Sequence, residues 1–156
     1  MDRIRADFDR IALVEEDAWN HNSHYHRVLW KGVPAYCQEA LKIGCGTGAF
    51  ARLLAERAGH VLALDLSPNM IRIAAEQSAQ DPNIDFQEGD VMDWRFSPGH
   101  FDCIASIATF HHLPLEEVLP TLTKALKPGG TLLILDLYTA EGLANLVSSA
   151  AAMPVH

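Results

Sequence analysis

The stretch Ala40-Leu41-Lys42-Ile43-Gly44-Cys45-Gly46-Thr47-Gly48-Ala49 decides the fold of this chain. Its apolar beginning, residues 40–43, is typical of a buried strand, and over residues 49–58 the apolar spacing becomes helical. Glycines are needed between the two where a side chain would keep a ligand from the backbone, or where the turn requires a positive φ. A tight turn that only serves packing uses the same residues. The position of the glycines after a strand and before a helix favours a nucleotide or nucleoside site.

The same alternation of short apolar runs and helical patterns continues along the chain. The runs predicted as strands are residues 40–43, 61–64, 84–87, 101–107 and 131–137, and the helical patterns between them are residues 49–58, 68–79 and 115–126. Strand followed by helix is the signature of crossover units. We therefore predict an α/β fold with a doubly wound, mostly parallel sheet of about five strands, whose ligands bind at the carboxyl ends of the strands.

The two ends of the chain differ from this core. Apolar residues recur at near-helical spacing over 4–13 and again over 23–31, before Pro34. We predict a single domain, 1–156, with a helical N-terminal cap at 1–38, a core at 39–138 and an Ala-rich C-terminal helix or tail at 139–156.

Composition limits the class of protein. The 156 residues carry a net charge of −8, with 49% hydrophobic and 21% charged residues, which is typical of a globular domain. An acidic chain without a basic run is not suited to general binding of nucleic acid or anionic membranes. The three cysteines are scattered, the N-terminus is charged, and no apolar run approaches the ~20 residues of a membrane span. These features predict a cytoplasmic protein without disulfides.

Carboxylates follow two of the predicted strands. Asp65 ends the second strand, where it can accept hydrogen bonds from both hydroxyls of a ribose, unless it is a solvated strand-end residue. Asp90 follows the third strand and can accept from an adenine amino group while the N–H of Val91 donates to the ring. An ordinary turn aspartate is the alternative there.

Five motifs in this order resemble the class I S-adenosylmethionine-dependent methyltransferases, over residues 40–137. The motifs are LKIGCGTG at 41–48, LDLSPNM at 64–70, Gly89-Asp90, Phe101-Asp102 and LKPGG at 126–130. The resemblance implies that the glycine loop faces the methionyl part of S-adenosylmethionine, Asp65 the ribose, and Asp90 with Val91 the adenine. Met70 would lie near the adenine, although its helical spacing with Ile73 also suits core packing.

The complete set of expected cofactor-binding residues includes two from the N-terminal cap, which in similar enzymes closes over the cofactor. The set is Gly44, Cys45, Gly46, Gly48, Asp65, Leu66, Met70, Asp90, Val91, Tyr25 and Arg27. Cys45 is expected to be simply a small residue of the loop, because nothing in the sequence marks a lowered thiol pKa.

Two features depart from the family pattern. Lys42 occupies a position that is usually acidic in the family, where a carboxylate helps to hold the ammonium of the cofactor. The chain also stops soon after the fifth predicted strand, whereas the family sheet normally has two more. We therefore expect an unpaired sheet edge and a homodimer formed through it.

Histidines are the remaining candidates for chemistry. His111 and His112 follow the fourth predicted strand, where an acceptor would sit, and either is a candidate general base; hydrogen-bonded wall residues are the alternative. Together with His21, His24 and His26 they lack a carboxylate or cysteine that completes a ligand set, so no metal is predicted.

The sequence thus predicts S-adenosylmethionine-dependent methyl transfer to a small-molecule acceptor. An NAD-dependent oxidoreductase is one alternative, because Gly44, Gly46 and Ala49 formally satisfy the dinucleotide fingerprint. A non-catalytic cofactor-binding or dimerisation module is the other. Asp90 favours the methyltransferase.

Overall fold

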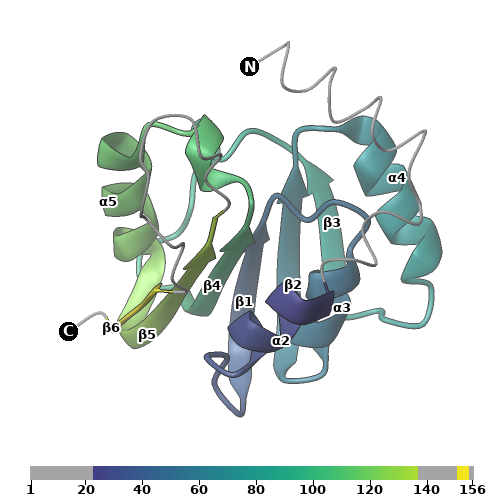
Figure 1. Ribbon diagram of the computed structural model, residues 1–156, viewed down its shortest axis with the longest axis horizontal. Helices are drawn as coiled ribbons and strands as arrows, with labels where there is room; N and C mark the ends of the chain where they lie inside the picture. Colours follow the sequence, from purple (N-terminus) through teal and green to yellow (C-terminus); the bar gives the residue numbers. More distant parts are fainter. Residues whose placement is uncertain (1–22, 137–150, 155–156) are drawn as a thin grey trace.

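The computed structural model describes residues 23–136 and 151–154, which form one twisted sheet flanked by helices (Figure 1). The strands are β1 (Cys37–Ile43), β2 (Ala58–Asp65), β3 (Ile84–Glu88), β4 (Phe101–Ile107), β5 (Leu126–Leu135) and β6 (Ala151–Pro154). Their order is β3-β2-β1-β4-β5-β6, and all neighbouring pairs from β3 to β5 are parallel. The predicted α/β fold and its five parallel strands are confirmed.

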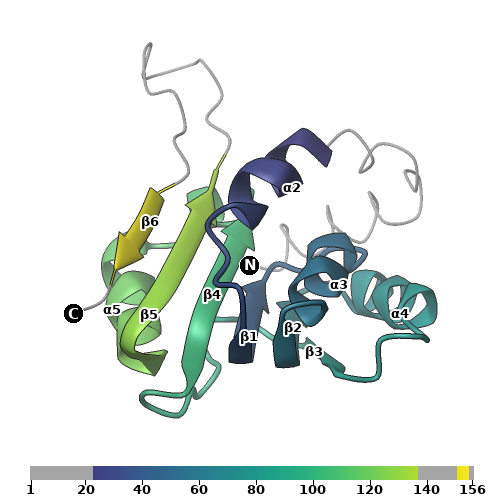
Figure 2. The same cartoon turned by 90° about the horizontal axis from the view of Figure 1, so that it is seen from below.

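Helices cover both faces of the sheet (Figure 2). They are α2 (Ser23–Trp30), α3 (Ala49–Ala55), α4 (Pro68–Gln77), a short 3₁₀ helix η2 (Phe110–His112) and α5 (Leu115–Ala125). One buried cluster lies under α2 and α3, and a second lies under α5. None of the helices formed by residues 23–136 has both the length and the hydropathy of a bilayer-spanning segment.

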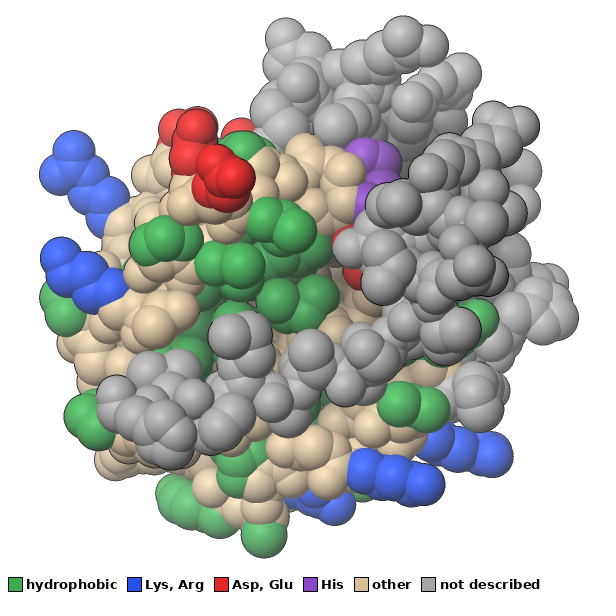
Figure 3. Space-filling model, turned by 60° about the vertical axis from the view of Figure 1, so that its left-hand side comes forward, with side chains coloured by type: hydrophobic (Ala, Val, Ile, Leu, Met, Phe, Trp, Pro, Cys, Tyr) green, Lys and Arg blue, Asp and Glu red, His purple; other side chains and the backbone are tan. Residues whose placement is uncertain are grey.

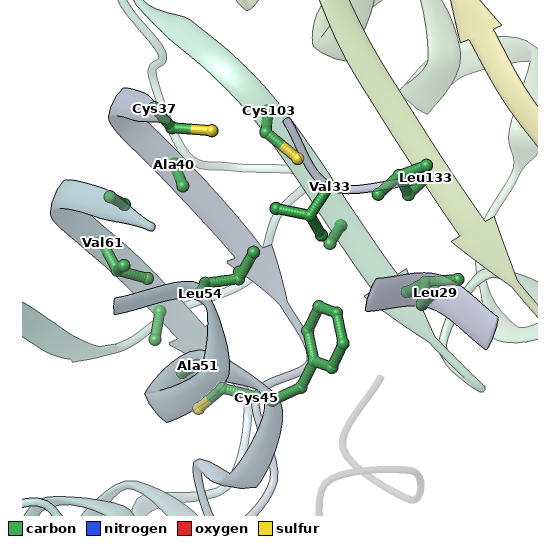
Figure 4. Close-up of a cluster of buried hydrophobic side chains, with 14 of the residues drawn as sticks. Leu29, Val33, Cys37, Ala40, Cys45, Ala51, Leu54, Val61, Cys103 and Leu133 are labelled. Carbon is green, nitrogen blue, oxygen red and sulfur yellow. The ribbon is translucent and has the colours of Figure 1, made fainter. Parts of the chain in front are cut away.

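The cluster under α2 and α3 contains all three cysteines (Figure 4). Cys37, Cys45 and Cys103 are buried and free. They pack there among Ala40, Leu54 and other small or aliphatic side chains, as small hydrophobes do.

The fifth strand begins earlier than the sequence pattern indicates. Leu126 already pairs with Phe101, and a register shift separates this pair from the one between Cys103 and Thr131. The Pro-Gly-Gly turn at 128–130, expected to lie before the strand, therefore lies within it as an irregularity.

The C-terminal edge of the sheet also differs from expectation. Strand β6 runs antiparallel to β5 and pairs with residues 131–134 of that strand. The expectation of an unpaired β5 edge is therefore wrong, and the reason for a homodimer through that edge falls away. Residues 151–154 of the predicted C-terminal helix or tail form this strand. Their backbone supplies hydrogen bonds that the edge of β5 would otherwise lack. Residues 137–150 and the predicted helix at 4–13 lie outside the described residues.

Asp102 ties three strands together at the end of the sheet opposite the glycine loop. Its Oδ2 accepts hydrogen bonds from the N–H groups of Gln38 (2.8 Å) and Glu39 (3.0 Å), and from Nζ of Lys127 (3.3 Å). Burial alone would raise the pKa of Asp102, but these donors lower it below its ordinary value. The Phe101-Asp102 motif thus has a structural role in this chain.

We predict that Asp102→Ala lowers the free energy of unfolding by about 1–3 kcal/mol at pH 7, because two backbone N–H groups lose their charged acceptor. The advantage of the wild type should shrink as the pH falls from about 4 towards the lowered pKa, where the folded carboxylate takes up a proton. Urea unfolding of the wild type and of Asp102→Ala at pH 7 and below about pH 4 measures this difference in the free energy of unfolding, with the exposed Asp85→Ala as control. Equal losses for the two variants at pH 7 would contradict the role of Asp102.

Candidate functional site

A cavity of about 890 Å³, its open mouth included, lies at the carboxyl ends of β1, β2 and β4 and beside the loop after β3. It is lined by His26, Lys42, Ile43, Gly44, Cys45, Gly46, Thr47, Ala49, Phe50, Leu64, Asp65, Leu66, Met70, Gly89, Asp90, Val91, Ile107, Ala108, Thr109 and Leu113. The cavity is therefore where an open parallel sheet is expected to bind a ligand.

The glycines of the loop after β1 have different roles. Gly44 (φ +64°) is pressed against Thr109, so that an added Cβ would collide with its side chain. Gly46 (φ +54°) faces open space, with no atom within 4 Å of an added Cβ. Gly48 lies against Arg52, Ala74 and Phe86, and is not part of the cavity wall. Only Gly46 therefore keeps its space clear for a ligand.

Asp65 lies at the end of β2 and is 8% exposed. Its Oδ2 accepts from the N–H of Gly46 (2.8 Å), and its Oδ1 accepts from the N–H of Ser67 (2.9 Å). Because a carboxylate oxygen can accept more than one hydrogen bond, Asp65 can hold the loop and also receive ligand hydroxyls. Leu66 follows it in the cavity wall.

The loop after β3 contributes the next part of the wall. Asp90 accepts from the N–H of Met92 at one carboxylate oxygen (2.9 Å), as a turn aspartate does, and it also lines the cavity. Val91 and Met70 are buried and line the cavity as well. Met70 thus serves both core packing and the wall.

Lys42 is the least expected member of the wall, since it is only 2% exposed. Its Nζ donates to the carbonyl oxygens of Ile43 and Gly44, both at 2.9 Å. Burial lowers the pKa of Lys42 to about 8, against the opposing effects of Cys45 and Asp65. Its ammonium does not reach solvent, so any charge that it carries is felt inside the cavity. Burial raises the pKa of Cys45, so this thiol is inert.

Helix α2 covers one side of the cavity, but not with the residues that the sequence suggested. His26 lines the cavity, whereas Arg27 is exposed and Tyr25 packs against the core cluster. The spacing of His26 with the buried Leu29 and Val33 (i, i+3, i+7) is the signal that marks the inner face. Burial, and then the charge of Lys42, lowers the pKa of His26.

Arg57 holds α2 in this position. Its guanidinium donates to the carbonyl oxygens of Val33 (2.9 Å) and Trp30 (3.2 Å), and it lies 3.7 Å from the centroid of the Trp30 ring. The cation–π contact and the two hydrogen bonds fix the end of the helix against the turn before β2.

The predicted bases lie beside the cavity and not in its wall. Nδ1 of His111 is 2.6 Å from Oδ1 of Asp136, the residue that directly follows β5. The ring centroids of His111 and His112 are 3.7 Å apart. Burial lowers the pKa of His112, and the neighbouring His111 lowers it further. On the face drawn in Figure 3, apolar side chains gather beside histidine and acidic side chains. Asp136 was missed by the sequence analysis, although a carboxylate ending an apolar run marks Asp65 in the same way.

No metal site accompanies these histidines in the part of the chain that the structure describes. Within that part, no three His, Cys, Asp or Glu side chains come together in an arrangement that could hold a metal ion. His21 and the side chain of His24 lie outside it.

The comparisons with known proteins decide the family. Residues 40–130 match the family described as "Methyltransferase domain". The chain belongs to the class I S-adenosylmethionine-dependent methyltransferases. An uncharacterized methyltransferase of Mycobacterium tuberculosis is 34% identical to this methyltransferase over 137 residues, covering 85% of the chain and 69% of the relative. A 2-phytyl-1,4-naphtoquinone methyltransferase of Synechococcus elongatus is 30% identical over 150 residues, covering 88% of the chain and 64% of the relative.

Solved structures agree. Phosphoethanolamine N-methyltransferase 2 of Haemonchus contortus, in complex with S-adenosyl-L-methionine, is 31% identical with a TM-score of 0.65, over 76% of this chain and 28% of that one. Phosphoethanolamine N-methyltransferase 1 of the same organism matches 99% of this chain and 37% of its own, with a TM-score of 0.78 and 21% identity, which supports the fold alone. This methyltransferase therefore spans 28–37% of the length of these two solved chains, 51% of another similar solved chain from Bacillus, and 64–69% of the two curated relatives.

The cavity fits S-adenosylmethionine. Gly46 leaves open the space that any other side chain would fill, and Asp65 and Asp90 present acceptors from neighbouring strand ends. The residues that would hold the cofactor are those of the loop 44–47 together with Asp65, Leu66, Met70, Asp90 and Val91.

We predict that Gly46→Val weakens binding of S-adenosylhomocysteine by at least 30-fold, because the added side chain enters the ligand's space. Gly129→Val is the matched control, since Gly129 (φ +77°) also has no atom within 4 Å of an added Cβ and lies away from the cavity. Both variants carry the strain of a positive φ, and isothermal titration calorimetry measures the affinities. Similar affinities for the two variants would show that the loop is only a turn.

We predict that the stability of this methyltransferase depends on pH through Lys42. The folded state loses the proton near pH 8 and the unfolded state near 10.5, so unfolding takes up a proton between these values and the free energy of unfolding rises with pH. The rise relative to Lys42→Met should reach about 3 kcal/mol between pH 7 and pH 10.5. Denaturant unfolding of both proteins across this range measures the difference, and parallel curves would contradict the burial of a charged lysine.

Proposed function

We propose that this methyltransferase acts on a small, apolar acceptor whose reacting atom carries a proton, as in a quinol. The observation that carries the proposal is the pair formed by His111 and Asp136 beside the cofactor cavity, where the neighbouring Thr109 and Leu113 belong to the wall. When bound, S-adenosylmethionine supplies an electrophilic methyl group on a sulfonium. The chain therefore has to orient the acceptor, exclude water and remove one proton.

His111 has the arrangement of a general base. Because a carboxylate accepts hydrogen bonds, we assign the proton of the neutral ring to Nδ1, which donates to Asp136 and leaves Nε2 as the acceptor. A carboxylate in this place also stabilises the imidazolium that forms when the proton is taken. Asp136 is buried and acts through His111, so we assign it as a positioning residue.

The wall on this side supports an apolar acceptor. Ile107 and Leu113 line the cavity next to η2, and Lys42 is the sole Lys or Arg among its described lining residues. A phosphate-bearing acceptor such as phosphoethanolamine would need further cations. The similarity to a naphtoquinone methyltransferase points in the same direction.

Ligand binding and methyl transfer test the function together. We expect calorimetry to detect S-adenosylhomocysteine and not NAD, and we expect labelled S-adenosylmethionine to methylate 2-phytyl-1,4-naphthohydroquinone more than phosphoethanolamine. Binding of NAD alone would favour an oxidoreductase. Binding of S-adenosylhomocysteine without transfer to any acceptor of a metabolite extract would favour a non-catalytic module.

We predict that His111→Gln and Asp136→Asn each lower kcat for the quinol at least 30-fold while leaving the affinity for S-adenosylhomocysteine unchanged. The double variant should be no slower than His111→Gln alone, because Asp136 acts through that ring. Steady-state kinetics with calorimetry on each variant measures both effects. Additive losses would contradict the pairing, and a larger loss in His112→Gln would move the base to that imidazole.

A further inference from the structure

The cofactor cavity has two aspartates on one side and a buried lysine next to them. The sheet order β3-β2-β1-β4 places Asp90 and Asp65 after β3 and at the end of β2, and Lys42 on β1, one strand further along. His26 of α2 also lines the cavity, but burial and the charge of Lys42 lower its pKa, so Lys42 is the basic side chain that carries charge there at pH 7. A nucleoside whose adenine and ribose bind the two aspartates therefore directs its remaining group towards Lys42.

We infer that Lys42 makes this site recognise the carboxylate of the amino-acid part of the cofactor and disfavour its ammonium. The inference rests on the proposed cofactor site and goes beyond it, since it concerns which charged group of the ligand the chain selects. An acidic residue at this position would have the opposite preference.

The geometry of the ammonium supports this role. Of its three N–H groups, two are taken by the carbonyl oxygens of Ile43 and Gly44 at 2.9 Å. These bonds hold Nζ in the wall at the start of the glycine loop, where a carboxylate can accept from the third N–H. Among the described residues, no hydrogen bond from Nζ to a carboxylate occupies that third position.

Two side chains near Lys42 bear on its charge. Asp65, on the adjacent strand, attracts the ammonium of Lys42, while its two oxygens accept from the N–H groups of Gly46 and Ser67. Cys45 stays protonated because burial raises its pKa. Since Lys42 is 2% exposed, solvent screens its charge little, and both attraction and repulsion are stronger than at a surface.

Three ligands separate the contribution of the carboxylate from that of the ammonium. 5′-Methylthioadenosine lacks the amino acid, decarboxylated S-adenosylhomocysteine keeps only the ammonium, and S-adenosylhomocysteine has both groups. For the wild type we expect S-adenosylhomocysteine to bind most tightly and the decarboxylated ligand most weakly, with at least a tenfold difference between them, by calorimetry at pH 7.

Variants of Lys42 should change this order. In Lys42→Asp the decarboxylated ligand should bind more tightly than 5′-methylthioadenosine, and in Lys42→Met the two should bind alike. Lys124→Met removes one positive charge from the exposed surface of α5 and should keep the wild-type order. Affinity for 5′-methylthioadenosine in each variant reports that the nucleoside site is intact.

The outcomes distinguish this inference from the proposed function. If the wild type binds the decarboxylated ligand as tightly as S-adenosylhomocysteine, or if Lys42→Asp leaves the ratio of their affinities unchanged, the inference is overturned while the cofactor site stands. If the wild type binds none of the three ligands, the cofactor site itself is overturned, and the inference with it.

Discussion

The hydrogen bond from the N–H of Gly46 to the carboxylate of Asp65, 2.8 Å long, is the contact on which the site depends. It joins the loop after β1 to the end of β2, so the two neighbouring strands present one surface to a ligand. The same carboxylate also accepts from Ser67, whose hydroxyl in turn caps α4 by accepting from the N–H of Met70. One buried carboxylate therefore organises the glycine loop, the start of a helix and the cavity wall.

Much of the site follows from residues close together in the sequence. The apolar runs, the glycines and the aspartates at strand ends predict the parallel sheet and the wall formed by Asp65 and Asp90, because each pattern is local. The part of the wall formed by α2 could not be predicted from local sequence, because it depends on the angle at which that helix docks. Arg57, 27 residues beyond Trp30, sets this angle. Asp136 ends an apolar run as Asp65 does, but its pairing with His111, 25 residues away, has no local signal. Strand β6 has four residues, two of them alanines, and carries almost no local signal of its own.

Strain is concentrated where the chain leaves the sheet beside the cavity. Ala108 adopts a φ of 55°, which is unusual for a residue with a side chain, directly after β4. Its N–H donates to the carbonyl oxygen of Leu135 (2.8 Å), which holds the strained turn against the end of β5. The ends of β4 and β5 are thereby kept together, and these are the ends that carry His111 and Asp136. The geometry of the pair thus depends on sheet pairing as well as on its own hydrogen bond.

Strand β6 also changes what the sheet offers to other molecules. An open edge of a sheet is a template on which a second chain can add strands and begin to aggregate. Here the outer strand is short and ends at Pro154, whose backbone has no N–H to donate. The opposite edge is β3, where Asp85, Gln87 and Glu88 are exposed. A short proline-ended strand on one side and acidic side chains on the other give both edges of this sheet protection against edge-to-edge aggregation.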